Sequence, residues 1–185
     1  SFAFQVHPDY PLILVGNRDE YHARPSAAAA WWGDKPHVLG GRDLLAGGTW
    51  LAASNEAHLA VVTNRPDLPP PDQDALSRGD LVTGALSPAT FSLAQLEEQH
   101  HQYGGFSLFM ANRETLTLIT GGNGTGFSRT SLQPGIHGIS NTAVEQPWPK
   151  VGWLNTEVNR LLGAHSPDPA TLLDLLGRRE SVPEA

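Results

Sequence analysis

The sequence contains no cysteine, and this absence removes three kinds of chemistry from its 185 residues. Without a thiol, these residues can form no disulfide, no thiolate metal site and no cysteine nucleophile. The sequence also lacks a run of about 18 apolar residues, the length that a helix needs to cross a bilayer. We therefore expect no membrane insertion.

Positive charge is scarce as well. The chain has 12 Lys and Arg against 19 Asp and Glu, which gives a formal net charge of −7. Such an acidic chain has no electrostatic basis for binding nucleic acid. The eight histidines show no spacing typical of a zinc site, so we expect no metal and no cofactor, although an isolated histidine could serve as a haem ligand. Hydrophobic residues make up 39%, enough for a packed core.

Targeting signals are missing from the ends of the sequence. The first residues, SFAFQVHPDY, have neither the basic region nor the continuous apolar region of a signal peptide. A cytoplasmic location is the resulting expectation. Ser1 begins within a predicted strand, and the last residues, ESVPEA, follow a predicted helix directly. We therefore expect a single domain over residues 1–185 that is truncated at both ends.

The order of the predicted elements indicates an α+β fold with two sheets and helices packed outside them. Ser77 is predicted to cap a helix, with Asp80 reaching back to it in a capping box. Apolar periodicity predicts strands over 2–6, 12–16, 37–41, 48–54, 58–64, 104–112, 115–121 and 136–141. It predicts two short helices between residues 77 and 102, and further helices over 151–162 and 169–176.

Polar residues gather where three of the predicted strands end. The run Asn17-Arg18-Asp19-Glu20 follows the second strand, Asn64 closes the strand over 58–64, and Asn141 closes the strand over 136–141. Asparagine is uncommon within strands, and its amide can donate a hydrogen bond to a developing oxyanion. These endings predict one shared polar site, with a solvated Asx turn as the alternative at each position.

Glycine-rich segments offer further candidates. The runs Gly40-Gly41-Arg42-Asp43 and Gly47-Gly48-Thr49-Trp50 allow close backbone approach, either to a ligand or to another segment. Trp50 could line a substrate pocket or belong to the core. The segment GGNGTG, residues 121–126, lacks both the spacing and the lysine of a phosphate-binding loop, so it is predicted to form a turn.

Several of these blocks, in this order, resemble the NRDE family, also called the transport and Golgi organization protein 2 family. The resemblance implies a four-layer αββα sandwich of two mainly antiparallel sheets, similar to the N-terminal-nucleophile hydrolases. It covers the chain from residue 2 to about residue 151. The blocks that carry it are NRDE with RP at 17–25, GRD at 41–43, GGTWL at 47–51, TN at 63–64, SRGDLV at 77–82, GFSL at 105–108, PGIHGISN at 134–141 and PWPK at 147–150.

The resemblance also implies a catalytic site. Family members begin Met-Cys, and that cysteine would lie about three residues before Ser1, where strand alternation turns Ser1 to the opposite face. By similarity to the cysteine acylases of the wider superfamily, Arg18 and Asp19 would lie beside the nucleophile. Asn64 and Asn141 would then donate to the oxyanion and the substrate. The predicted substrate-binding residues are Asn17, Arg42 and Trp50.

Two functions remain open at this stage. One is an N-terminal-nucleophile-type amide or acyl hydrolase, or an acyltransferase, of unknown substrate. The other is a non-catalytic ligand-binding or trafficking protein that handles haem or acyl lipids, as the link of eukaryotic relatives to transport and Golgi organisation implies. Either function requires a small-molecule substrate or ligand. The true N-terminus would separate them, because a processed, exposed cysteine favours the enzyme. The oligomeric state is not predicted.

Overall fold

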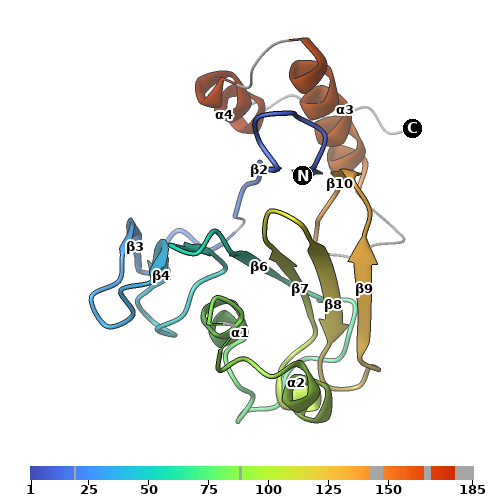
Figure 1. Cartoon of the computed structure of the whole chain (residues 1–185). Coiled ribbons are helices and arrows are strands. Elements are labelled where there is room, and N and C mark those ends of the chain that lie inside the picture. Colours follow the sequence, from blue (N-terminus) through green and yellow to red (C-terminus); the bar gives the residue numbers. More distant parts are fainter. Residues whose placement is uncertain (19, 88, 142–147, 165–167, 178–185) are drawn as a thin grey trace. The chain divides into compact units, whose positions relative to one another are not determined.

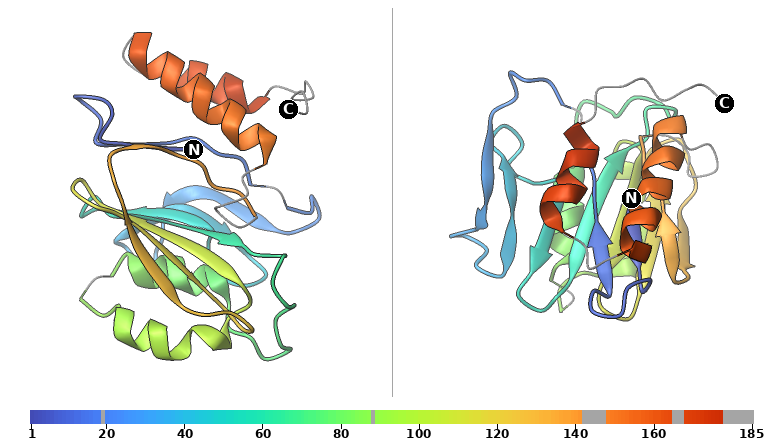
Figure 2. Two further views of the ribbon diagram at one scale, coloured as in Figure 1. Left: turned by 90° about the vertical axis from the view of Figure 1, so that its right-hand side faces the viewer. Right: turned by 90° about the horizontal axis from the view of Figure 1, so that it is seen from above.

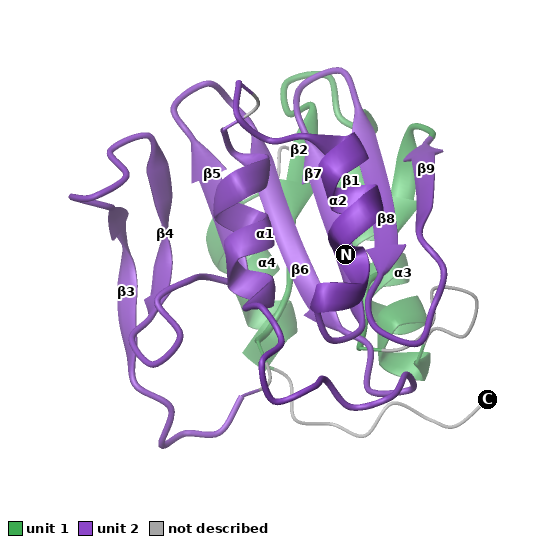
Figure 3. Cartoon of the chain, turned by 90° about the horizontal axis from the view of Figure 1, so that it is seen from below, with its two compact units in different colours: residues 1–19, 133–185 green, residues 20–132 purple. Residues whose placement is uncertain are grey.

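Figure 3 shows two compact units in the computed structural model of the chain. Unit 1 comprises residues 1–19 and 133–185, and unit 2 comprises residues 20–132. The structure describes residues 1–18, 20–87, 89–141, 148–164 and 168–177. Among these residues, each unit contains one antiparallel sheet and two α-helices. The single domain predicted over residues 1–185 stays a prediction.

Unit 2 is built on an antiparallel sheet whose seven described strands lie side by side in chain order (Figure 1). The helices α1 (Arg78–Ala85) and α2 (Leu93–Gln99) and the 3₁₀ turn η1 (His100–Gln102) connect β6 to β7. The strands are β3 (Ser26–Trp31), β4 (Val38–Asp43), β5 (Leu51–Ser54), β6 (Leu59–Asn64), β7 (Phe106–Ala111), β8 (Leu116–Gly121) and β9 (Ser128–Leu132).

The helices α1 and α2 lie on one face of this sheet (Figure 2). Val82 of α1 and Leu96 of α2 share a buried core with Val62 of β6 and Leu108 of β7. Because side chains alternate along a strand, even-numbered residues of β6 and β7 face the helices and odd-numbered residues face away from them. This alternation decides which polar residues share a face at the end of the sheet.

Unit 1 contains a smaller sheet and the two C-terminal helices. Its strand order is β10-β1-β2, with β1 (Phe2–Phe4) in the centre between β2 (Leu12–Leu14) and β10 (Gly135–His137). The helices are α3 (Pro149–Ala164) and α4 (Pro169–Gly177). Ala3 packs in one buried cluster with Val158 of α3 and Leu172 of α4. The two helices therefore cover the face of this sheet to which Ala3 points.

The α+β fold with two antiparallel sheets is confirmed. Each unit has a sheet with helices on one face, which is half of the predicted αββα arrangement, and the stacking of the four layers stays a prediction. The predicted helices and most strands form within a few residues of their expected bounds. The strand predicted over 136–141 is shorter, because β10 ends at His137.

Two strands of unit 2 were missed by the sequence analysis. The strand β3 carries four consecutive alanines, and all six of its residues are exposed, so no apolar alternation marks it. The strand β9, Ser128–Leu132, is polar and exposed over its first four residues. Both lie at the edges of the sheet. They form by pairing with β4 and β8, a tertiary effect that local sequence does not reveal.

The predicted cap of α1 is confirmed in part. Ser77 has extended backbone angles, and its Oγ accepts a hydrogen bond from the backbone N–H of Gly79 at 3.3 Å. A capping box would also need the Asp80 carboxylate to accept from the Ser77 N–H. No such bond forms among the described residues, so Asp80 contributes its charge to the first turn instead.

Ala57 has a backbone conformation that favours glycine. It lies in the turn between β5 and β6 with a φ of 60°, and there an L residue brings its Cβ too close to the following carbonyl oxygen. We expect Ala57→Gly to raise the free energy of unfolding by about 0.5–1 kcal/mol in urea denaturation. The matched control is Ala28→Gly on exposed β3, which should lower it. Equal losses in both variants would contradict the proposed relief of strain.

Candidate functional site

The register of the unit 1 sheet brings the ends of two strands to the start of β1. Phe2 pairs with Leu14 of β2 and with His137 of β10, and both neighbours run antiparallel to β1. The chain therefore leaves β2 toward Arg18 and leaves β10 toward Asn141 at the same end of the sheet. This convergence of two predicted site segments lies within one unit.

The predicted residues of unit 1 have different surroundings. Asn17 is exposed, and its Nδ2 donates to the backbone oxygen of Leu176 at 3.1 Å, which ties the segment after β2 to the end of α4. Arg18 and Asn141 are half-buried. Asp19 lies outside the described residues. The catalytic roles of Arg18, Asp19 and Asn141 and the substrate-binding role of Asn17 stay predictions.

Ser1 faces the helices of unit 1. Its Oγ donates to Oδ1 of Asn155 on α3 at 2.6 Å, on the side of the sheet to which Ala3 also points. The backbone nitrogen of Ser1 donates to the Val15 oxygen at 2.7 Å. The family cysteine, an odd number of residues earlier, would point to the opposite face of the sheet.

Several sequence blocks meet at one end of the unit 2 sheet. Asn64 at the end of β6 is in register with Phe106 at the start of β7. The N–H of Val62 donates to the Trp50 oxygen at 2.9 Å, which continues the β5–β6 pairing toward Gly48 and Thr49. A Cβ placed on Gly48 would come within 2.8 Å of the Gly79 Cα. The GGTW, TN, SRGD and GFSL blocks therefore lie together.

Strand alternation separates the two residues of the TN block. Asn64 lies on the face of the sheet that carries α1, whereas Thr63 lies opposite, in register with Ser107. Ser107 is fully buried, and its Oγ has no hydrogen-bond partner among the described residues. Thr63 and Ser107 belong to the TN and GFSL blocks, but neither was predicted as a site residue from the sequence. Counting alternate positions from the apolar residues of β6 would have indicated them.

Arg42 and Trp50 hold structural positions. The Arg42 guanidinium lies over the Trp32 ring at 4.3 Å, and its two terminal nitrogens donate to Asp34 at 2.6 and 2.8 Å. Hydrogen bonding from Arg42 holds the pKa of Asp34 below its ordinary value. Trp50 is half-buried and packs against the core beneath α1. A substrate-binding role for Arg42 or Trp50 stays a prediction.

An ion pair links two blocks that lie far apart in sequence. Nε and Nη2 of Arg24 donate to Oδ2 of Asp43 at 2.8 and 2.7 Å, and Glu20 lies 3.8 Å from Nε. The other Asp43 oxygen accepts from the N–H groups of Leu45 and Ala46. Burial raises the pKa of Asp43, but these hydrogen bonds outweigh it and hold the pKa below 3.8.

Asp43→Asn should lower the free energy of unfolding by about 2–3 kcal/mol at neutral pH. The amide presents N–H groups where the carboxylate accepted charged hydrogen bonds, and the Arg24 guanidinium loses its nearer counter-charge while Glu20 stays at 3.8 Å. Because the folded-state pKa of Asp43 is lowered, its contribution is complete above pH 3.8 and is lost as the pH falls through the folded value. Urea denaturation at several pH values should show the difference from the wild type shrinking in acid.

The control for Asp43→Asn is Asp34→Asn. The Asp34 side chain is also paired with an arginine but is 51% exposed, against 14% for Asp43. Its substitution should lower the free energy of unfolding by much less than Asp43→Asn does, since solvent screens exposed pairs. Equal losses in the two variants would mean that the Arg24 pair contributes no more than a surface contact.

Comparison with known proteins decides the family. Residues 1–184 match the family described as Transport and Golgi organisation 2. The chain belongs to this family. The human Transport and Golgi organization protein 2 homolog is 39% identical over 153 residues, covering 77% of this chain and 54% of the human protein. The mouse homolog is 37% identical over 151 residues, with the same coverage of each chain.

Relatives within the Transport and Golgi organisation 2 family extend to insects. The Drosophila melanogaster Transport and Golgi organization protein 2 is 41% identical over 86 residues, which are 43% of this chain and 30% of that protein. The chain spans about half the length of the human and mouse relatives that it matches. The resemblance inferred from the sequence blocks is therefore confirmed.

Neither a membrane-spanning helix nor a cluster of metal-ligating side chains is found in the described part of this family member. No helix there is both long enough and apolar enough to span a membrane. The described residues also contain no group of three or more His, Cys, Asp or Glu side chains arranged to hold a metal ion.

Proposed function

We propose that the full-length protein is a cytoplasmic N-terminal-nucleophile-type amide or acyl hydrolase whose nucleophile is the family cysteine upstream of Ser1. The register of β1 carries this proposal. Phe2 pairs with Leu14 and His137, so each step back along β1 is one step forward along both neighbours. The pairing ends at Leu14 and His137 in the structure. If it continued in the full-length protein, the residues opposite the cysteine position, four steps back from Phe2, would be Arg18 and Asn141.

The proposed reaction proceeds through a thioester. The cysteine sulfur attacks the carbonyl carbon, and its proton passes to the free α-amino group, which acts as the base. The Asn141 amide would donate to the oxyanion. The catalytic role of Asn64 that the family resemblance implies stays a prediction. The carbon–nitrogen bond then breaks, the amine leaves with the proton, and water hydrolyses the thioester to release the acid. Arg18 and Asp19 would orient the sulfur and the amino group.

Acylation of the cysteine tests this proposal without knowledge of the natural substrate. Full-length protein that begins at the processed cysteine is incubated with p-nitrophenyl acetate, and the acyl group is located by mass spectrometry. We expect acylation at the N-terminal cysteine and none there after Cys→Ala. Asn141→Ala should slow acylation by about 10²-fold, the effect of removing one oxyanion donor.

The control for Asn141→Ala is Asn159→Ala, on the exposed side of α3, which should leave the rate unchanged. Undiminished release of p-nitrophenol by the Cys→Ala variant would refute a cysteine nucleophile. An Asn141→Ala rate equal to that of the wild type would remove Asn141 from the oxyanion site.

A second candidate function is non-catalytic ligand binding or trafficking. The observation in its favour is the name of the relatives, which refers to transport and Golgi organization. On this proposal the site holds haem or an acyl lipid and no bond is broken. Titration of the purified protein with haem and with acyl-CoA tests it, and failure of both to bind would exclude the two ligands.

A further inference from the structure

Arg78 is a half-buried cation at the first position of α1. Its Nη1 donates to the backbone oxygen of Gly105 at 3.1 Å, and the same oxygen accepts from the N–H of Arg65 at 3.0 Å. A Cβ on Gly104 would lie only 3.4 Å from Nη1. The backbone at 104–105 thus holds one side of the guanidinium, and no hydrogen bond from its other nitrogens forms among the described residues.

No carboxylate among the described residues forms an ion pair with Arg78. Nearby Arg24 adds a like charge, but Arg24 is itself matched by Asp43 at 2.7 Å and Glu20 at 3.8 Å. Burial, and secondly the charge of Arg24, lower the pKa of Arg78. Asp80 lies two residues further along α1 and forms no ion pair with Arg78 either. Of these two arginines, Arg24 has two acidic partners, whereas Arg78 has no ion-pair partner among the described residues.

The backbone places a neutral donor beside this cation. Asn64 is exposed, lies on the α1 face of the sheet and directly precedes Arg65, whose N–H shares the Gly105 oxygen with Arg78. Its side-chain amide has no hydrogen-bond partner among the described residues. Contact between Gly48 and Gly79 packs the 43–48 loop against the first turn of α1, which fixes Arg24 and Arg78 in one cluster.

We propose that Arg78 and Asn64 bind the anionic group of a small ligand, a carboxylate or a phosphate. A partly desolvated charge without a counter-ion is unfavourable, and an anion that replaces the missing acid removes that cost. The planar guanidinium fork fits both carboxylate and phosphate oxygens in a bidentate manner. The positive end of the α1 dipole adds potential of the same sign. This site goes beyond the proposed hydrolase and does not depend on the nucleophile.

Anion titration of the purified protein tests the proposal. Inorganic phosphate and acetate are added in separate experiments at constant ionic strength, and backbone amide shifts near Arg78 and Gly105 are followed by NMR. We expect saturable shifts with at least one anion, and the tighter one identifies the source as phosphate or carboxylate. Arg78→Gln should weaken binding by about tenfold or more, since it removes a charged, bidentate donor.

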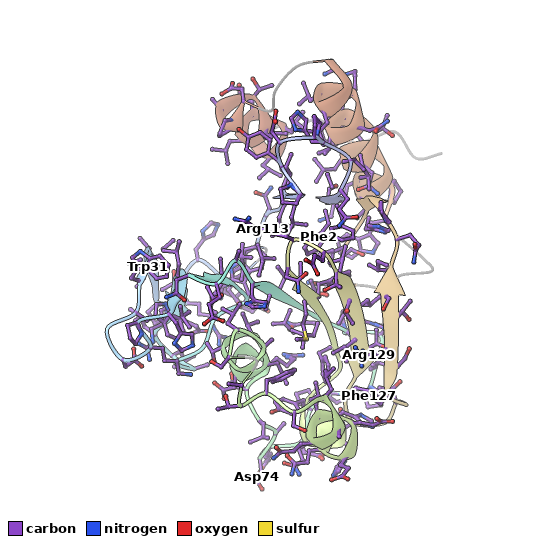
Figure 4. All side chains as sticks on the ribbon, in the orientation of Figure 1. Phe2, Trp31, Asp74, Arg113, Phe127 and Arg129 are labelled. Atoms are coloured by element: carbon purple, nitrogen blue, oxygen red, sulfur yellow. The ribbon has the colours of Figure 1, made fainter. Side chains whose placement is uncertain are left out.

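The matched control is Arg129→Gln, which removes the same charge from exposed β9 of the same sheet (Figure 4). It should leave anion binding unchanged. Absence of saturable shifts with both anions, or equal affinity in wild type and Arg78→Gln, would overturn the site. Neither result bears on acylation of the cysteine, so this proposal and the hydrolase can fail separately.

A second measurement on the wild type does not rely on the folding of a variant. Phenylglyoxal modifies arginine side chains, and mass spectrometry reports the rate at each position. The tighter-binding anion should slow modification of Arg78 by several-fold more than modification of Arg129. Equal protection of the two arginines would show that the anion acts on the reagent or on the whole surface, and would overturn the site.

Discussion

Gly122→Ala is expected to lower the free energy of unfolding by about 3–5 kcal/mol, through backbone strain and overpacking together. Gly122 has a φ of 130°, a conformation that L residues rarely adopt. A Cβ at this position would lie 2.5 Å from the Gly105 Cα and 2.7 Å from the Gly105 nitrogen. These are backbone atoms, so no rotamer change can make room.

The control for Gly122→Ala is Gly126→Ala in the same turn. No atom lies within 4 Å of a Cβ at Gly126, and its φ is not positive. Chemical denaturation of the two variants should therefore separate them by more than about 2 kcal/mol. Losses that agree within about 1 kcal/mol would mean that the turn relaxes away from Gly105 at little cost.

The turn at Gly122 was predicted from the sequence, but its contact with Gly105 was not. The glycine spacing at 121–126 predicted a turn, and a turn forms there between β8 and β9. The contact of Gly122 with Gly105 could not be predicted, because it depends on the register of β7 and β8, in which Phe106 pairs with Gly121. Register is set by packing along the whole hairpin. Local composition therefore indicated the turn but not its partner.

The strands that could be predicted are those with a buried face. In β6 and β7, apolar residues pack beneath α1 and α2, and burial leaves a pattern in the sequence. The alanine run of β3 has no such pattern, because all its residues are exposed and its only described strand partner is β4. Edge strands form through ladder hydrogen bonds, which side-chain patterns do not encode.

The candidate site was likewise predictable only in part. Polar residues at strand ends predicted Arg18, Asn64 and Asn141, and the register of unit 1 delivers two of them to one end of β1. The pairing of Arg24 with Asp43 spans two separate blocks, so no local spacing could reveal it. The unpaired charge of Arg78 could not be predicted from the sequence. Capping by Ser77 is enough to explain the SRGD block, and only the structure shows which side chains surround Arg78.

Gly48→Ala should also lower the free energy of unfolding by about 2–4 kcal/mol, and it should loosen the first turn of α1. A Cβ on Gly48 would meet the Gly79 Cα at 2.8 Å and the Gly79 carbonyl carbon at 2.9 Å. A Cβ on Gly79 would in turn meet the Thr49 nitrogen at 2.9 Å. Because either substitution separates the same two backbones, Gly79→Ala should have a similar effect, and the two together should cost less than their sum.

The control for both variants is Gly33→Ala, where no atom lies within 4 Å of the added Cβ. Thermal unfolding and urea denaturation should leave that variant close to the wild type. Since the Gly48–Gly79 contact positions Arg78, Gly48→Ala should also weaken anion binding, whereas Gly33→Ala should not. A Gly48→Ala protein as stable as Gly33→Ala would show that the loop is not held against α1. Full stability loss with unchanged anion binding would show instead that Arg78 is positioned by Gly105 alone.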